Sequence, residues 1–410
     1  MNPGRPLVIV GASYAGLQAA ASARELGFQE RIYLIGEEPH APYQRPALSK
    51  GLLTRQVRED QLPLRSPGFF ADQDIDLLTR TRVTSIDPAA RRAVLDKSIP
   101  LDYGWLVMAT GASPRALRIP GADLERAFQL RTVDDALAIA KAADTAQQVC
   151  VLGGGYIGLE VAAALTARGK KVTVLESQAR VLARSMPECM SAYLEAAHRR
   201  RGVDLRTSQR VRALAPCQGR VAGVELADGT RVDCEMVVLG IGAAPNAGVA
   251  QAAGLAVSNG IEVDLQARTS APNVLAAGDV ACMPSPTAAD GSGRVRLESI
   301  QAAIDGAKAA AATLVGRNQP VSAVPWFWSD QFDLKLQMVG MPQPGDEVVV
   351  RGDMATDRFS VAYLRRGTLV ALHSVNRPAE HMLARKLIAN QVRPCVAILA
   401  DSSLDLRVAC

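Results

Sequence analysis

Three glycines and one glutamate have the types and spacing needed to bind a dinucleotide. Gly153, Gly155 and Gly158 form a GxGxxG string between an apolar run and a helix-like segment, and Glu176 ends the next apolar run. A pyrophosphate needs backbone N–H groups at a helix N-terminus with no side chain in the way. A carboxylate placed like Glu176 binds ribose hydroxyls and repels a 2′-phosphate. The pattern therefore predicts a site that favours NADH over NADPH, although two arginines follow shortly after the glutamate.

A second, less regular glycine string lies near the start of the sequence. Gly11 and Gly16 occupy the outer positions, and Ser13 stands where the middle glycine usually lies. Serine is small enough to let the backbone approach a phosphate. Glu37 follows the second apolar run and is the candidate for a ribose contact, with Glu38 as the alternative. Two dinucleotide sites in one chain are most economically explained by a flavoenzyme that binds FAD at one site and a nicotinamide at the other.

The elements that must position these residues form two βαβ units. Each consists of a short apolar run, a glycine turn, a helix and a second apolar run: residues 7–10, 17–26 and 32–35, then 149–152, 159–167 and 172–175. This order is typical of buried parallel strands. The units lie too far apart for a solenoid repeat, so two separate nucleotide-binding domains fit better. We predict an α/β fold with two Rossmann-like domains in a glutathione-reductase-like arrangement.

The sequence changes in character after about residue 320. Strand-like segments replace Ala-rich helices at residues 326–328, 334–339, 347–350, 359–364 and 369–375. They predict a small C-terminal α+β domain over residues 321–410. The other predicted limits are 1–112 and 243–320 for a discontinuous FAD domain and 113–242 for the NADH domain inserted into it. The segment 284–293 is rich in Pro, Ser, Gly and Asp, and we expect it to be an exposed loop.

Composition excludes several classes of protein. With 410 residues, 48% of them hydrophobic and 21% charged, the chain is globular rather than disordered. Its net charge of +5 is far from the clustered excess of a nucleic-acid binder. No apolar run is long enough for a membrane span, and no signal-peptide pattern precedes the first apolar run. The seven cysteines are odd in number, widely spaced and form no CxxC, so we expect reduced thiols and a cytoplasmic location.

Four strings give the sequence a resemblance to a known family: Pro42–Lys50, Gly153–Glu160, Arg296–Ile300 and Pro325–Gln331. Over nearly its whole length the chain resembles the flavoprotein reductases with two dinucleotide-binding domains. Within them it is most similar to the FAD-dependent NADH:ferredoxin reductases, of the putidaredoxin reductase and aromatic-ring dioxygenase type. Ser13 and Gln44 are modest departures from the family's pattern.

The resemblance implies which positions hold the two cofactors. The residues expected to line FAD are Gly11, Ser13, Ala15, Gly16, Glu37, Arg45, Lys50, Val83, Ala109, Thr110, Gly111, Arg131, Asp279, Glu298, Ile300 and Trp328. Those expected to meet NADH are Gly153, Gly154, Gly155, Tyr156, Ile157, Gly158, Glu160, Glu176 and Gly242. No residues are expected to bind a metal, since the four histidines show no metal-site spacing with the cysteines.

Lys50 and Glu160 are the catalytic candidates. An ammonium near N5 of the flavin would stabilise the negative charge of the reduced ring. A buried lysine needs a counter-charge, and the resemblance places Glu160 on the nicotinamide side to supply it. The alternative for Lys50 is an ordinary surface lysine at the start of a helix.

The region around Lys50 contains no cysteine between residues 38 and 60. Disulfide reductases of related architecture carry two cysteines there, and NADH oxidases and peroxidases usually carry one. The absence predicts that electrons leave to an external acceptor, and the resemblance implies that this acceptor is a [2Fe–2S] ferredoxin that serves a monooxygenase or a ring-hydroxylating dioxygenase. Rubredoxin reductase and an NADH oxidase or peroxidase are the enzymatic alternatives, and a non-catalytic redox-sensing flavoprotein is the alternative from a different class.

Three features are candidates for contact with an acidic ferredoxin. Trp326 and Trp328 flank Phe327, where an aromatic docking surface competes with ordinary core packing. Arg65 is a docking residue by resemblance. Residues 193–220 hold seven arginines against two acidic residues, a pattern that would steer an acidic partner but also suits a helix C-terminus. We expect a monomer or weak dimer with no nucleic-acid or membrane partner.

Overall fold

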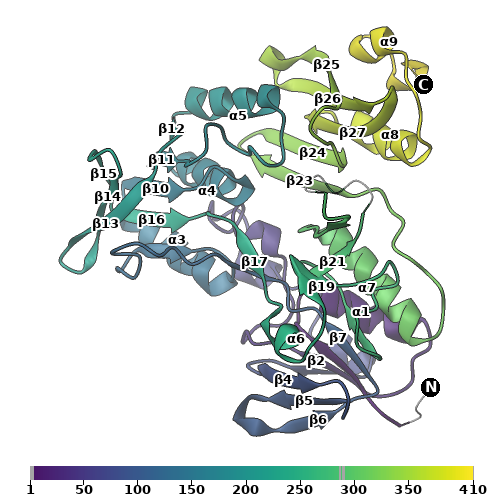
Figure 1. Cartoon of the computed structure of the whole chain (residues 1–410). Helices are drawn as coiled ribbons and strands as arrows, with labels where there is room; N and C mark the ends of the chain where they lie inside the picture. Colours follow the sequence, from purple (N-terminus) through teal and green to yellow (C-terminus); the bar gives the residue numbers. More distant parts are fainter. Residues whose placement is uncertain (1–3, 286–287, 289–290, 410) are drawn as a thin grey trace.

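The computed structural model describes residues 4–285, 288 and 291–409. Its first sheet has five parallel strands in the order β20 (Val274–Ala276), β7 (Trp105–Met108), β1 (Leu7–Val10), β2 (Ile32–Ile35) and β3 (Ile75–Leu78). Segments far apart in the sequence thus share one sheet (Figure 1). Helices α1 (Tyr14–Glu25) and α7 (Ile300–Leu314) pack against each other beside it.

Smaller elements surround this first sheet. They are β4 (Val83–Asp87), β5 (Arg92–Leu95) and β6 (Pro100–Asp102), which form an antiparallel sheet, together with β18 (Val257–Ser258), β19 (Gly260–Glu262), β21 (Ala281–Pro284), β22 (Arg294–Val295) and the short helices α2 (Phe69–Asp72) and α6 (Gly248–Ala252). The predicted loop 284–293 begins where β21 ends. Residues 286–287 and 289–290 of that loop lie outside the described residues.

The second sheet repeats the parallel arrangement. Its strands lie in the order β12 (Asp204–Arg206), β11 (Lys171–Leu175), β10 (Gln148–Leu152), β16 (Met236–Leu239) and β9 (Ala127–Gln129). Helices α3 (Val133–Thr145), α4 (Tyr156–Ala167) and α5 (Glu188–Arg200) accompany it, with an antiparallel sheet of β13 (Val211–Cys217), β14 (Arg220–Leu226) and β15 (Arg231–Asp233) at one end (Figure 1). The chain passes between the two parallel sheets through β8 (Ala112–Pro114) and β17 (Ala243–Pro245), which pair with each other. The domain limits given above stay a prediction.

The C-terminal part forms a five-stranded antiparallel sheet. Its order is β23 (Trp326–Gln331), β24 (Leu334–Gly340), β27 (Thr368–Val375), β26 (Arg358–Arg365) and β25 (Glu347–Asp353), followed by α8 (Pro378–Ala389) and α9 (Val396–Ala400). Arg351 is 1% exposed, and its guanidinium binds Glu380 together with backbone carbonyls of the last segment. This buried cation ties the C-terminal helices to the sheet.

Both nucleotide-site helices begin earlier than the sequence predicted. Helix α1 starts at Tyr14 rather than residue 17, and α4 starts at Tyr156 rather than residue 159. The physical reason is that the last glycine of each string lies inside the first helical turn. Ser13 and Gly155 are the N-cap residues. Within the described residues, no helix is long and apolar enough to cross a membrane.

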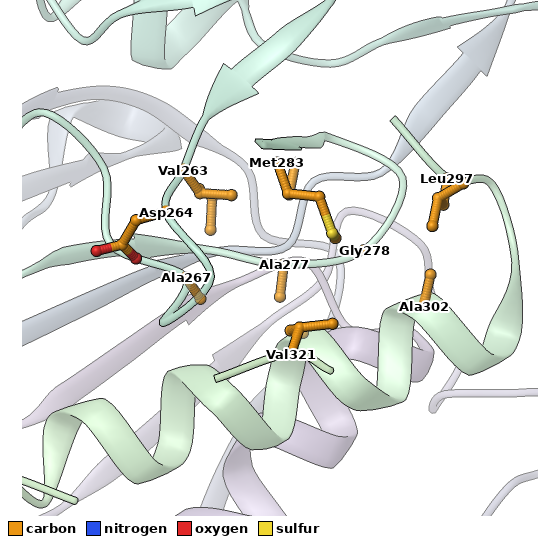
Figure 2. A pocket seen from close by; sticks show the side chains of 12 residues that line it. Val263, Asp264, Ala267, Ala277, Gly278, Met283, Leu297, Ala302 and Val321 are labelled. Atoms are coloured by element: carbon orange, nitrogen blue, oxygen red, sulfur yellow. The ribbon is translucent and has the colours of Figure 1, made fainter. Parts of the chain in front are cut away.

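A small apolar cavity lies behind Gly278, between the turn after β20 and helix α7. Figure 2 shows Met283, Leu297 and Ala302 among its lining side chains. Its volume is about 10 Å³, which is room for a single water molecule at most. This volume is too small for a cofactor or substrate. In open α/β folds, ligands bind instead at the carboxyl ends of the parallel strands.

Candidate active site

The first glycine turn brings the N-terminus of α1 against the end of β7. Gly11 has φ +118°, and a Cβ there would lie 2.1 Å from the Ala109 carbonyl oxygen. A Cβ on Gly16 would lie 1.9 Å from the Gly11 carbonyl oxygen. Both glycines are thus required by the turn itself. Ser13 makes no side-chain capping bond, which leaves the helix N-terminal N–H groups to a ligand.

Two partly buried arginines, Arg45 and Arg131, add positive charge beside this turn. Arg45 donates from Nε to Ser13 Oγ at 3.2 Å and from Nη1 to the Arg131 carbonyl at 2.7 Å, and it also pairs with Glu38. Arg131 Nη2 lies 3.9 Å from Asp279 Oδ2. Burial raises the pKa of the Asp279 carboxyl, and the Arg131 charge opposes that shift. Burial, together with repulsion from Arg45, lowers the pKa of Arg131. A helix N-terminus with two guanidinium groups suits a pyrophosphate.

The second glycine turn has the same construction at the N-terminus of α4. Gly153 has φ +108°, with a Cβ position 2.4 Å from the Gly240 carbonyl oxygen, and a Cβ on Gly158 would lie 2.0 Å from the Gly153 oxygen. Gly155 is different, since its φ of −79° suits any residue and its nearest neighbour would be 3.9 Å from a Cβ. Nothing in the protein itself requires a glycine there. The open space in front of Gly155 is what a bound pyrophosphate would fill.

The Glu176 carboxylate lies across this second turn. The Gly154 N–H donates to Oε2 at 2.6 Å, and the Gln178 N–H donates to Oε1 at 2.7 Å. Arg180 is engaged elsewhere, because it donates to the Met186 carbonyl and to Ser191 Oγ. The two arginines that follow Glu176 and could meet a 2′-phosphate are Arg180 and Arg184. Of these, Arg180 is bound within the protein.

Lys50, in the segment after β2, forms an ion pair with Glu160 of helix α4. Lys50 Nζ lies 3.1 Å from Glu160 Oε1, with the two side chains 18% and 7% exposed. Ser49 Oγ donates to Oε2 at 2.5 Å, and Ser329 Oγ donates to Oε1 at 2.6 Å. Lys50 is therefore not an ordinary surface lysine. Its charge is held in place by a buried carboxylate that accepts three donors.

The other predicted FAD residues fall into two groups. Those that adjoin the first turn include Ala15, whose Cβ faces Gly278, and Gly111, whose Cβ position is 3.0 Å from Arg131 Nη2; Ala109 and Thr110 belong to the same strand end. For the second group, the contacts seen in the described structure are with other parts of the protein than the first glycine turn. Val83 is buried in a core cluster, Glu37 is exposed near Arg82, and Glu298 pairs with Arg296. Ile300 begins α7, and Trp328 stacks on Trp326. The cofactor roles of both groups remain predictions.

On the nicotinamide side, the remaining predicted residues follow the second turn. Tyr156 packs edge-on against Phe327, with the two ring centroids 4.8 Å apart. Ile157 is 49% exposed. Gly242 follows β16 with φ +100°. Its neighbours include Arg115 and Arg184.

The three aromatic residues of β23 divide between its two faces. Trp326 and Trp328 stack on one face, with their ring centroids 5.8 Å apart, and Phe327 lies on the other face. Trp326 also packs against His381 and under Arg385, so core packing explains it well. A docking role for Trp328 stays a prediction, as does one for Arg65, whose guanidinium lies over Phe69.

The arginine-rich stretch of residues 193–220 is more neutral than its composition indicated. Six of its seven arginines pair with carboxylates: Arg199, Arg200, Arg201, Arg206, Arg212 and Arg220. Arg200 and Arg201 pair with Asp357 and Asp333 of the C-terminal part. These two arginines join α5 to the C-terminal sheet, which weakens the case for docking at this surface.

Four residues that support the ion pair could not be recognised from their positions in the sequence. Ser49 and Ser329 bind Glu160 directly, while Gln331 and His198 stand behind Ser329. Ser49 and Ser329 lie inside strings already singled out, but no sequence pattern connects them with residue 160. His198 lies in the stretch 193–220, whose sequence indicates only a basic helix end.

Two cradles, each formed by a strand end, a glycine turn and a helix N-terminus, fit two dinucleotides with a charged pair between them. These features define a flavoprotein oxidoreductase with two dinucleotide-binding sites. Residues 5–307 match the family model of the pyridine nucleotide-disulphide oxidoreductases, and residues 326–410 match that of the reductase C-terminal domain. The chain belongs to the pyridine nucleotide-disulphide oxidoreductase family, and it is an FAD-binding enzyme that uses a nicotinamide dinucleotide.

Similar proteins are matched over nearly their whole length. Rhodocoxin reductase of Rhodococcus erythropolis is 41% identical over 98% of this chain and 94% of its own. Putidaredoxin reductase of Pseudomonas putida is 38% identical over 99% and 97%. Among solved structures, the ferredoxin reductase for the CYP199A2 system from Rhodopseudomonas palustris has a TM-score of 0.95 at 39% identity, covering 99% of this chain and 100% of that one. The covalent putidaredoxin reductase–putidaredoxin complex also gives 0.95, at 37% identity over 99% and 98%.

Proposed function

We propose that this enzyme is an NADH:ferredoxin reductase that delivers single electrons to a [2Fe–2S] ferredoxin serving a monooxygenase or a ring-hydroxylating dioxygenase. The observation that carries the proposal is that residues 38–60, around the Lys50–Glu160 pair, contain no cysteine. Without a thiol in that region, the chain has no cysteine redox centre there to take the electrons, so they pass to an external acceptor. The names of the similar reductases, which include ferredoxin reductases of oxygenase systems, support the same acceptor class.

The residues of the chain divide the work of binding and charge placement. When bound, FAD supplies the capacity to accept a hydride from the nicotinamide and to release electrons one at a time. The two glycine turns offer N–H groups to the pyrophosphates. Arg45 and Arg131 add positive charge at the first turn. Lys50 holds a fixed positive charge between the two sites, and Glu160 keeps that charge in one place.

Electron delivery is tested by NADH-dependent cytochrome c reduction with and without candidate [2Fe–2S] ferredoxins. We expect a low rate without ferredoxin and a rate at least about tenfold higher with a matching one, since electrons need a docked carrier. Rapid oxygen consumption without any ferredoxin would instead indicate an oxidase. Selective stimulation by rubredoxin would indicate a rubredoxin reductase. A long-lived NADH complex with no turnover would indicate a sensor.

Glu176 is proposed to select NADH over NADPH. Replacing it by alanine removes the carboxylate that repels a 2′-phosphate, so the ratio of kcat/KM for NADPH to that for NADH should rise by about tenfold or more. Glu176 also fixes the Gly154 and Gln178 N–H groups, so KM for NADH should rise as well. Glu195→Ala on the neighbouring helix is the control for loss of a nearby charge. An unchanged cofactor ratio in Glu176→Ala would remove this role.

We further propose that the enzyme is a monomer or weak dimer in the cytoplasm. The six cysteines of the described region are all free thiols, which supports a reducing compartment. Light scattering across a concentration series would settle the oligomeric state.

A further inference from the structure

The Glu160 carboxylate is a meeting point of three segments that are far apart in the sequence. Glu160 itself comes from α4, Lys50 and Ser49 come from the segment after β2, and Ser329 comes from β23 of the C-terminal sheet. Ser329 and Lys50 contact the same oxygen, Oε1. The position of the lysine charge therefore depends on a residue of the C-terminal sheet.

Ser329 is itself held by a chain of buried hydrogen bonds. A carboxylate in an ion pair can only accept, so the Ser329 hydroxyl donates to Glu160. Its oxygen then accepts from Gln331 Nε2 at 3.1 Å, which directs Gln331 Oε1 toward His198 Nε2 at 2.9 Å. Every donor in this series of hydrogen bonds points toward Glu160, an arrangement in which successive hydrogen bonds strengthen one another.

The last residue of this hydrogen-bond series, farthest from Glu160, is a neutral histidine. His198 is fully buried, and burial lowers its pKa to about 4. The donor order requires its proton on Nε2, which leaves Nδ1 as a bare lone pair, and Nδ1 has no hydrogen-bond partner within the described residues. The order of donors from Glu160 to His198 therefore assigns the histidine proton to Nε2.

The surrounding packing holds β23 where Ser329 and Gln331 can form these hydrogen bonds. Strand alternation places Phe327, Ser329 and Gln331 on the face toward α4, where Phe327 packs on Tyr156. Arg201 pairs with Asp333 just beyond β23, and this contact joins the strand to α5. The C-terminal sheet is therefore held against the nicotinamide side at both ends of β23.

We propose that Ser329, supported by Gln331 and His198, is a positioning residue for the reductive half-reaction, which orients Glu160 and through it the ammonium of Lys50. This proposal rests on the proposed role of Lys50. It adds that the C-terminal sheet, beyond any docking function, takes part in setting the charge between the two cofactor sites.

The test compares Ser329→Ala with a matched control, Ser360→Ala. Ser360 is also fully buried in the C-terminal sheet, and its hydroxyl donates to the buried Glu380 at 2.5 Å. In the holoenzyme, Ser329→Ala should lower the limiting rate of flavin reduction by NADH by about tenfold and change the flavin's midpoint potential. The dissociation constant for NAD⁺ should stay unchanged. Ser360→Ala should leave rate and potential as they are, and Ser329→Thr, which keeps the hydroxyl, should restore most of the rate.

A double variant distinguishes failure of this proposal from failure of the Lys50 role. If Ser329 acts through Lys50, Lys50→Met/Ser329→Ala should reduce flavin no more slowly than Lys50→Met alone. Multiplicative losses, or equal losses in Ser329→Ala and Ser360→Ala, would mean that Ser329 has only a structural role. A normal rate in Ser329→Ala with a slow Lys50→Met would overturn the positioning proposal alone. A normal rate in Lys50→Met would overturn the proposed role on which it rests.

Discussion

Lys50→Met is expected to slow the reduction of bound flavin by NADH by about 100-fold. Methionine keeps most of the volume of the side chain but removes the positive charge that Glu160 holds between the two cofactor sites. Removing one preorganised electrostatic contact from an enzyme site typically costs this much. The measurement is stopped-flow bleaching of the flavin at saturating NADH. Lys141→Met, which removes an exposed lysine on α3, is the control for overall charge.

Loss of stability must be separated from loss of rate in this variant. Lys50→Met leaves the Glu160 carboxylate buried without its cation, which costs about 3–5 kcal/mol when a buried ion pair is broken. The double variant Lys50→Met/Glu160→Gln removes that lone charge and should recover much of the stability. It should not recover the rate, because the positive charge is still missing. If the double variant regains normal flavin reduction, the slow rate of Lys50→Met reflects misfolding and the electrostatic role of Lys50 is wrong.

The cofactor turns could be predicted from sequence because their strand, glycine string and helix are consecutive in the chain. Gly153, Gly158 and their neighbours define these elements within about twenty residues. The contact that requires Gly158 is with Gly153 in the same unit, whereas the contact that requires Gly153 is with the distant Gly240 carbonyl and is visible only in the structure. The antiparallel C-terminal sheet was also visible as strand-like segments, although all five strands extend beyond the predicted limits, β23 and β25 by three residues and the others by one or two. Strand ends depend on pairing partners, which a single segment does not reveal.

The support around Glu160 could not be predicted because its contacts are distant in sequence. Ser329 lies 169 positions from Glu160, and His198 lies 133 positions from Gln331. Serine, glutamine and histidine are common residues whose types alone do not indicate partners. Charge counting in residues 193–220 failed for the same reason, since Asp333 and Asp357 neutralise that surface from outside the stretch. Local composition describes a surface only when its counter-charges are local too.

Gly155→Asp is expected to raise KM for NADH by about 100-fold or more while the protein still folds and retains FAD. The backbone at residue 155 is extended, and the nearest atom to a new Cβ is 3.9 Å away, so the fold accepts a side chain. The space that the aspartate enters is where the pyrophosphate is proposed to lie. A like charge at about 4 Å in a site of intermediate dielectric costs enough to produce a change of this size.

Three companion variants accompany this prediction, and the first two separate the effect of filled space from the effect of added charge. Gly155→Ala fills part of the space without adding charge, so it should raise KM for NADH by a smaller factor. The ratio of the two KM values, Gly155→Asp over Gly155→Ala, then measures the charge repulsion. Gly248→Asp adds the same charge at another glycine with open space and should change neither KM nor FAD content. Gly158→Ala should instead lower the yield of folded protein, because its Cβ would lie 2.0 Å from the Gly153 carbonyl oxygen. If Gly155→Asp binds NADH normally, the nicotinamide dinucleotide does not cross this turn. The glycine at 155 would then lack any function, since the fold does not need it.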